Sequence, residues 1–184
     1  MRADARRNRE LLLAAALATF TEQGADDTSL EEVARRAGVG IGTLYRHFPG
    51  RQALLEAVYR DQVEALCARA RALLADPPAA ALVTWLRAMV EFSATKHTLT
   101  AALTAGYGKD TQLFSACRED LVAAATALLT RAQQAGAVRP DVTAIDLLRL
   151  SHAVALVTQR AADGPDQAER MLSLMLDGVL LPAP

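Results

Sequence analysis

The 184-residue chain has few of the residues that mark disulfide-rich, metal-binding or sheet-based proteins. It contains two cysteines, three histidines, 7 prolines, 10 glycines and 4% aromatic residues. Cys67 and Cys117 stand far apart with no Cys/His cluster nearby, so the sequence predicts neither a disulfide framework nor a zinc site. No apolar run reaches the roughly 18 residues of a membrane-spanning helix. We therefore expect no metal, no cofactor and no membrane partner.

The chain also lacks a large excess of either charge, because its 20 Lys and Arg residues nearly balance its 21 Asp and Glu residues and leave a formal net charge of -1. The total therefore indicates neither a polyanionic nor a polycationic partner. Alanine and leucine dominate the composition, and both are strong helix formers. The sequence predicts an all-α protein.

Glycine and proline divide the chain into predicted helices. A first amphipathic helix ends at Gly24. Shorter helices follow over about 30–37 and 41–48, and a long fourth helix covers 51–75. Further helices are expected at about 79–95, 98–105, 110–135, 141–161 and 165–181.

Arg6 and Arg7, ahead of the apolar residues 11–18, have the outline of a twin-arginine export signal. Glu10 interrupts that pattern, and apolar residues recur at every fourth position, as they do in an amphipathic helix. We interpret this segment as a folded helix and expect a cytoplasmic protein with reduced thiols.

The segment 28–51 has the pattern of a helix-turn-helix, with two short helices joined by a glycine-containing link. Thr28 and Ser29 each begin an S/T-x-x-E capping box. Residues 35–51 hold four arginines and no acid, and residues 2–9 hold four arginines against one acid. This local excess of positive charge, hidden in the total, suits a duplex whose major groove accepts one helix.

Residues 28–51, TSLEEVARRAGVGIGTLYRHFPGR, resemble the DNA-binding signature of TetR/AcrR-type transcriptional regulators. The resemblance extends over about residues 8–60. Farther along, Trp85-Leu86 and residues 94–97 are loosely similar to the carboxy-terminal domain of an SbtR-like subgroup. The resemblance implies an amino-terminal helix-turn-helix DNA-binding domain, 1–51, and a helical ligand-binding and dimerisation domain, 52–184, joined through the long fourth helix.

The resemblance also implies which residues touch DNA. Phosphate contacts fall to Thr43, Tyr45, His47 and Arg51, and groove contacts to Gly40, Ile41, Gly42 and Arg46. Hydroxyl, imidazole and guanidinium groups suit phosphate oxygens, and an arginine such as Arg46 can contact guanine through two hydrogen bonds. His47 as a purely structural histidine stays open, and so do phosphate contacts from Arg35 and Arg36. Arg2, Arg6 and Arg7 form an arm that either follows the backbone, enters a minor groove, or is a solvated terminus without DNA.

The carboxy-terminal helices are apolar on more than one face, which indicates a second partner besides their own subunit. We expect a homodimer. The candidate interface residues are Leu148, Leu156, Met171, Leu174 and Met175. The candidate pocket residues for a lipophilic ligand are Trp85, Met89, Phe92, His97, Tyr107, Phe114, Cys117 and His152. Core packing explains the stripe of Trp85, Met89 and Phe92 more simply than a pocket does, because any buried helix shows such spacing.

The functional hypothesis is a homodimeric, ligand-responsive repressor that binds a palindromic operator in double-stranded DNA and is released by a small lipophilic effector. The alternative is an all-helical adaptor or enzyme whose helix-turn-helix is only architectural. Catalysis is disfavoured because the sequence has no Glu-x-x-His pair, no metal-ligand spacing and no nucleophile motif. We therefore expect no catalytic residues.

Overall fold

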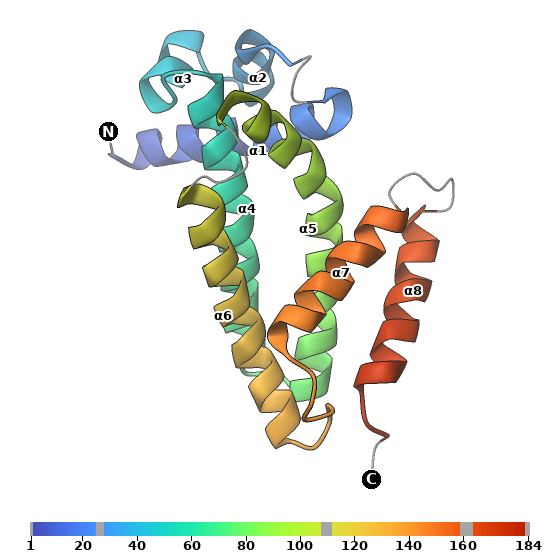
Figure 1. Ribbon diagram of the computed structural model, residues 1–184. Helices are drawn as coiled ribbons and strands as arrows, with labels where there is room; N and C mark the ends of the chain where they lie inside the picture. The colour runs from blue at the N-terminus through green and yellow to red at the C-terminus, as the bar shows by residue number, and fades with distance from the viewer. Residues whose placement is uncertain (1, 25–27, 108–111, 159–163, 183–184) are drawn as a thin grey trace. The chain divides into compact units, whose positions relative to one another are not determined.

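The structure is a computed structural model that describes residues 2–24, 28–107, 112–158 and 164–182. Within these ranges the chain is all-helical, as predicted, and an isolated bridge between Val138 and Leu180 is the only pairing of extended backbone (Figure 1). The helices are α1 (Arg2–Gln23), α2 (Leu30–Ala37), α3 (Ile41–His47), α4 (Arg51–Leu73), α5 (Pro78–Tyr107), α6 (Gln112–Gln134), α7 (Ala144–Thr158) and α8 (Gly164–Val179). No described helix combines the length and the apolarity that a membrane span requires.

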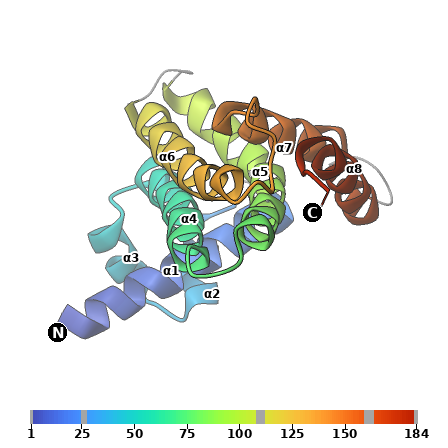
Figure 2. The same cartoon turned by 90° about the horizontal axis from the view of Figure 1, so that it is seen from below.

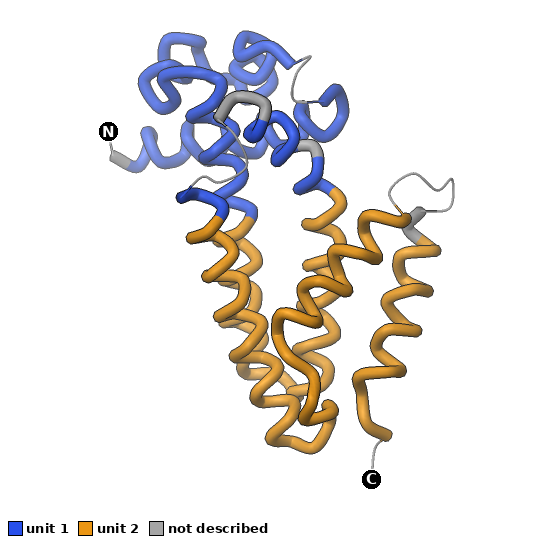
Figure 3. Tube along the Cα trace, viewed as in Figure 1, with its two compact units in different colours: residues 1–62, 95–114 blue, residues 63–94, 115–184 orange. Residues whose placement is uncertain are grey.

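The chain divides into two compact units (Figure 3). Unit 1 comprises residues 1–62 and 95–114, and unit 2 comprises residues 63–94 and 115–184. Helices α4, α5 and α6 each contribute residues to both units. The division into domains 1–51 and 52–184 stays a prediction.

The core of unit 1 forms around α1, whose apolar residues repeat at every fourth position. Leu12, Ala16 and Phe20 are buried, which confirms the amphipathic helix predicted there. Thr19 is also buried, and its hydroxyl donates to the Ala15 carbonyl at 2.7 Å. Helices α2 and α3 both contact α1.

The predicted break between residues 95 and 98 is wrong, because α5 runs without interruption from Pro78 to Tyr107. Neither glycine nor proline occurs between residues 79 and 105, so nothing there stops a helix. The threonines are accommodated inside it. Thr100 donates its hydroxyl to the Lys96 carbonyl at 2.9 Å, and Thr104 donates to the Thr100 carbonyl at 2.8 Å.

Unit 2 is tied together by contacts from α5. The Trp85 side chain is fully buried, and its Nε1 donates to the Leu66 carbonyl of α4 at 2.9 Å. On the other side, the Arg87 guanidinium makes a two-pronged ion pair with Glu169 of α8, at 2.7 Å. Helices α7 and α8 lie side by side and contact each other (Figures 1 and 2).

Candidate nucleic-acid interface

Helix α2 is held at both ends by local signals in the sequence. The Glu32 backbone N–H donates to the Ser29 hydroxyl at 3.1 Å, so Ser29 is the N-cap. The Thr28 hydroxyl donates to the Gly24 carbonyl instead. At the other end Gly38 has a φ of 65°, and its N–H bonds to the Arg35 carbonyl. This left-handed turn ends α2 and begins the short link to α3.

Helix α3 has one buried face and one open face. Leu44 and Phe48 are buried and attach the helix to unit 1, as their one-turn spacing predicts. The open face carries Ile41, Gly42, Tyr45 and Arg46. Tyr45 is 47% exposed. This face combines an aromatic hydroxyl, an arginine and exposed backbone on one helix.

Other predicted contact residues surround this face at different depths. Thr43 and His47 are partly buried, and Gly40 is exposed. Gly40 provides the N-cap position of α3 without a side-chain hydrogen bond. The His47 ring lies 6.1 Å from the Phe48 ring, centroid to centroid.

The predicted arginine arm belongs to the first turns of α1. Arg6, Arg7 and Arg9 are exposed there, and the side chain of Arg2 lies outside the described residues. The Arg9 guanidinium lies 6.0 Å from the centre of the Phe48 ring, at the end of α3. This contact places an arginine of α1 beside the end of α3.

The arginines at the end of α2 and the start of α4 make contacts within unit 1. Arg36 makes a two-pronged ion pair with Glu22 of α1 at 2.7 Å, and this guanidinium holds the pKa of Glu22 below its usual value. Arg35 pairs with Glu32 one turn away on its own helix. Arg51 donates one guanidinium nitrogen to the Thr28 carbonyl, while its Nη2 is buried and has no partner among the described residues.

Two family models match the chain. Residues 12–58 match the family described as "Bacterial regulatory proteins, tetR family", and residues 77–181 match "Transcriptional regulator SbtR-like, C-terminal domain". The second match alone covers more than half of the chain. The chain belongs to the TetR family of transcriptional regulators. Both parts of the family resemblance predicted from the sequence are confirmed, and the helix-turn-helix is a DNA-binding domain.

Solved structures agree with this assignment. The TetR-family chain is 41% identical to a TetR transcriptional regulator from Streptomyces coelicolor, with a TM-score of 0.84 over 95% of this chain and 99% of that one. It is 38% identical to a TetR regulatory protein from Mycobacterium vanbaalenii, with a TM-score of 0.79 over 98% and 99%.

The curated relatives match about a third of the chain. The HTH-type transcriptional regulator TtgW of Pseudomonas putida is 43% identical over 56 residues, which are 30% of this chain and 42% of that protein. The TetR-family chain covers less than half the length of the first curated relatives that it matches.

The predicted pocket residues of this TetR regulator do not form one cluster. Trp85, Met89, Phe92 and Cys117 are buried in unit 2. His97 and His152 are exposed, so neither requires a partner in the protein interior. Phe114 is partly buried in unit 1, where its ring meets the Tyr59 ring edge-on at 5.4 Å. The side chain of Tyr107 lies outside those that the structure describes.

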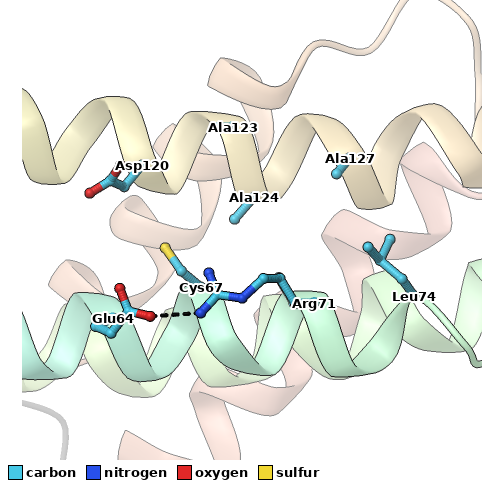
Figure 4. A pocket seen from close by; sticks show the side chains of 9 residues that line it. Glu64, Cys67, Arg71, Leu74, Asp120, Ala123, Ala124 and Ala127 are labelled. Atoms are coloured by element: carbon cyan, nitrogen blue, oxygen red, sulfur yellow. Dashed lines mark hydrogen bonds and ion pairs between the residues drawn. The ribbon is translucent and has the colours of Figure 1, made fainter.

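A hollow of about 290 Å³ lies between α4 and α6 (Figure 4). None of the predicted pocket residues lines it, and on its α4 wall Arg71 pairs with Glu64 at 2.6 Å (Figure 4). Burial, with a further contribution from the Asp120 carboxylate, raises the pKa of the Cys67 thiol on its wall. A thiol kept protonated is a poor nucleophile. Among the described residues no three potential metal ligands come together.

The candidate interface residues form part of an apolar surface on the α7–α8 pair. Leu156 is 52% exposed and Leu174 is 63% exposed. Met171 is exposed, whereas Leu148 and Met175 are partly buried. Further exposed apolar residues of the two helices are Ile145, Leu150 and Val157.

Sequence reasoning missed contacts between residues far apart in the chain. Glu22 and Arg36 are fourteen positions apart on different helices, and no local spacing signals their pairing. It also missed Ser93 and Ser151, two buried serines of unit 2. The available signal for Ser93 is its place eight positions after Trp85, on the same helical stripe.

Proposed function

We propose that this protein is a homodimeric, ligand-responsive transcriptional repressor of the cytoplasm that binds a palindromic operator and leaves it when a small lipophilic effector binds. The observation that carries DNA recognition is the two-faced helix α3. Its buried Leu44 and Phe48 fix the helix, and its open face presents Ile41, Tyr45 and Arg46. This arrangement suits a recognition helix better than an adaptor surface, because both exposed backbone and a guanidinium are available for groove contacts.

The proposed DNA contacts keep the roles assigned from the family resemblance. Phosphates are contacted by Thr43, Tyr45, His47 and Arg51, the groove by Gly40, Ile41, Gly42 and Arg46, and the backbone or minor groove by Arg2, Arg6 and Arg7. For Arg51, Nη1 donates to the Thr28 carbonyl and Nη2 is buried, so the proposed phosphate contact requires the guanidinium to turn outward when DNA binds. The pairing of Arg36 with Glu22 favours a role in holding α1 to α2 over a phosphate contact.

The proposed dimer uses α7 and α8. Exposed leucines such as Leu156 and Leu174 cost free energy in water, and a second copy of the same surface covers them around a two-fold axis. Leu148, Met171 and Met175 complete the proposed interface. A two-fold dimer presents its recognition helices about 34–36 Å apart or at a multiple of that spacing, which requires a palindromic operator.

The proposed effector site lies in the helical domain. Trp85, Met89, Phe92 and Cys117 offer a buried apolar lining. The exposed His97 and His152 fit an entrance better than an interior, and Tyr107 and Phe114 remain candidates.

A gel shift against the DNA upstream of the protein's own gene tests operator binding. Tyr45→Phe removes a proposed phosphate contact and is expected to weaken binding to all DNA sequences by a similar factor. Arg46→Ala is expected to reduce the discrimination between bases at one position of the operator. Arg69→Ala, an exposed arginine of α4 in unit 2, is the control and should leave binding unchanged. The reverse pattern for Tyr45 and Arg46 overturns the assignment, and no binding at low salt favours the adaptor or enzyme alternative.

A further inference from the structure

Two serine hydroxyls of unit 2 are buried without a partner. Ser93 on α5 is 2% exposed and Ser151 on α7 is 0% exposed. Neither hydroxyl oxygen has a hydrogen-bond partner among the described residues. Thr19 and Thr158, which are also buried in helices, instead donate to the carbonyl four residues earlier, at 2.7 and 2.8 Å. The two serines therefore differ from the other buried helical hydroxyls of this chain.

Both hydroxyls belong to the apolar interior of unit 2. Ser93 follows Trp85 and Met89 at intervals of four residues, on one face of α5. Ser151 shares the buried face of α7 with Leu147 and Val154. Helix α7 lies beside α5 in both views (Figures 1 and 2). The apolar stripe proposed for effector binding thus includes the Ser93 hydroxyl, and the buried face of α7 carries the Ser151 hydroxyl.

Among the described residues of unit 2, no Asp, Glu, Lys, Arg or His is buried. The buried polar residues of the described chain are all hydroxyl residues: Thr19, Thr28, Ser93, Ser151 and Thr158. In unit 2, Thr158 is satisfied by the Val154 carbonyl. Arg131 also has a buried nitrogen without a partner, but its side chain is partly exposed and donates to the Asp76 carbonyl. A charged ligand in this interior would lose its hydration without gaining a counter-ion.

Buried polar groups in folded proteins almost always have a partner, which is either another part of the protein or a bound molecule. A hydroxyl can donate to a carbonyl, ether or alcohol oxygen and can accept from an alcohol. We propose that Ser93 and Ser151 are the polar anchors of the effector site, and that the effector is a neutral apolar molecule carrying oxygen acceptors. This inference rests on the proposed function, and it specifies the chemistry of the ligand.

Four probes of similar size and different polarity test the inference on the full chain by isothermal titration calorimetry. Acetophenone carries a carbonyl oxygen, isopropylbenzene is its apolar counterpart, and benzoate and benzylammonium are its charged counterparts. We expect acetophenone to bind more tightly than the other three. Ser93→Ala and Ser151→Ala should each weaken acetophenone binding about three- to tenfold, which is the effect of losing one neutral hydrogen bond. Neither substitution should change the affinity for isopropylbenzene.

Two controls separate anchoring from a structural role. Ser173→Ala changes an exposed serine of α8 and should leave acetophenone binding unchanged. Thermal unfolding of the Ser93 and Ser151 variants without any probe should show an unchanged or higher Tm, because alanine favours the helix and no hydrogen bond is lost. A lower Tm in both variants would mean that the hydroxyls bond within the protein, which contradicts the inference.

The remaining outcomes distinguish this inference from the proposed function. Absence of acetophenone binding, equal binding of benzoate or benzylammonium, or unchanged affinity in both serine variants overturns the inference, while the gel shift still judges operator binding independently. A different result is that acetophenone binds through the serines and yet leaves the protein on the operator at saturation. That result supports the anchoring role of Ser93 and Ser151 and contradicts the proposal that a ligand of this site releases the operator.

Discussion

Gly42 lies on the open face of α3, where an added methyl group would meet no other atom of the protein. Gly42→Ala is therefore expected to raise the free energy of unfolding, by up to about 1 kcal/mol, because alanine favours a helix. Operator affinity should nevertheless fall about tenfold or more, because the methyl group prevents close approach of the α3 backbone to the groove. Urea unfolding and a gel shift measure the two effects separately.

Gly38→Ala is the matched control for that variant. Its added methyl group also meets nothing, but the backbone has a φ of 65°. We expect the free energy of unfolding to fall by ~1–2 kcal/mol, because a side chain in the left-handed region is strained. Operator binding by the folded fraction should remain. A Gly42→Ala protein that binds the operator as tightly as the parent would exclude a backbone contact there.

The Cys67 thiol should react slowly in the folded protein. Its pKa is raised, first by burial and then by the Asp120 carboxylate. We expect alkylation by iodoacetamide at pH 8 to be about tenfold slower than in the urea-unfolded chain, because the thiolate is the reactive form. Peptide mass spectrometry measures the rate at this site. Rapid labelling of the folded protein at neutral pH would show that the thiol is ionised and accessible.

At the scale of elements, α7 begins with a reciprocal cap. The Thr143 hydroxyl donates to the Asp146 carboxylate at 2.6 Å, and the Asp146 N–H donates to the Thr143 hydroxyl at 3.2 Å. Thr143→Ala should lower the free energy of unfolding by about 1 kcal/mol. Thr126→Ala, within α6 and away from any cap, is the control and should cost less. Urea titration of both variants checks the ranking.

The cap of α7 also has a pH dependence. Hydrogen bonds from Thr143 lower the pKa of Asp146 below its ordinary value of 3.8. A lowered pKa in the folded state means that the stabilisation is present above the unfolded-state pKa and is lost as the pH falls through the folded-state pKa. The difference in Tm between the parent and Thr143→Ala should therefore shrink in acid. An equal difference at pH 7 and pH 2 would contradict the role of the carboxylate.

Among the elements, the short helices of the DNA-binding part were predictable, because their ends are encoded locally by Ser29, Gly38 and Pro49. The unbroken helix from Pro78 to Tyr107 was not predicted, because two helices, 79–95 and 98–105, are expected in its place. Threonine lowers helix propensity only slightly, and its hydroxyl finds an acceptor one turn back, so packing decides the outcome.

At the scale of the whole molecule, the exposed apolar residues of α7 and α8 predict the oligomeric state. Leu156→Asp combined with Leu174→Asp should convert a dimer at micromolar concentration into a 19.6 kDa monomer in sedimentation equilibrium. In a dimer of this variant each subunit would bury two carboxylates, and the free-energy cost of removing them from water would exceed the stabilisation from the remaining apolar contacts. Helical circular dichroism should be retained, and operator affinity should fall steeply, because each half-site is then bound singly.

Leu74→Asp is the control for that experiment, because Leu74 is an exposed leucine of unit 2 outside α7 and α8. It should leave the sedimentation behaviour unchanged. A parent protein that sediments as a monomer, or a double variant that still dimerises, would place the interface elsewhere or remove it.

By itself, the sequence determined the helical class, the ends of the first helices, the face of α3 that is buried and the family. These features depend on hydrogen bonds and side-chain spacings within about four residues, so a linear pattern records them. Only the tertiary structure decided that Arg36 pairs with Glu22, that Arg51 reaches Thr28, and that Ser93 and Ser151 are buried with no partner among the described residues. Such pairings depend on which helices the folded chain brings together, and no local spacing carries that information.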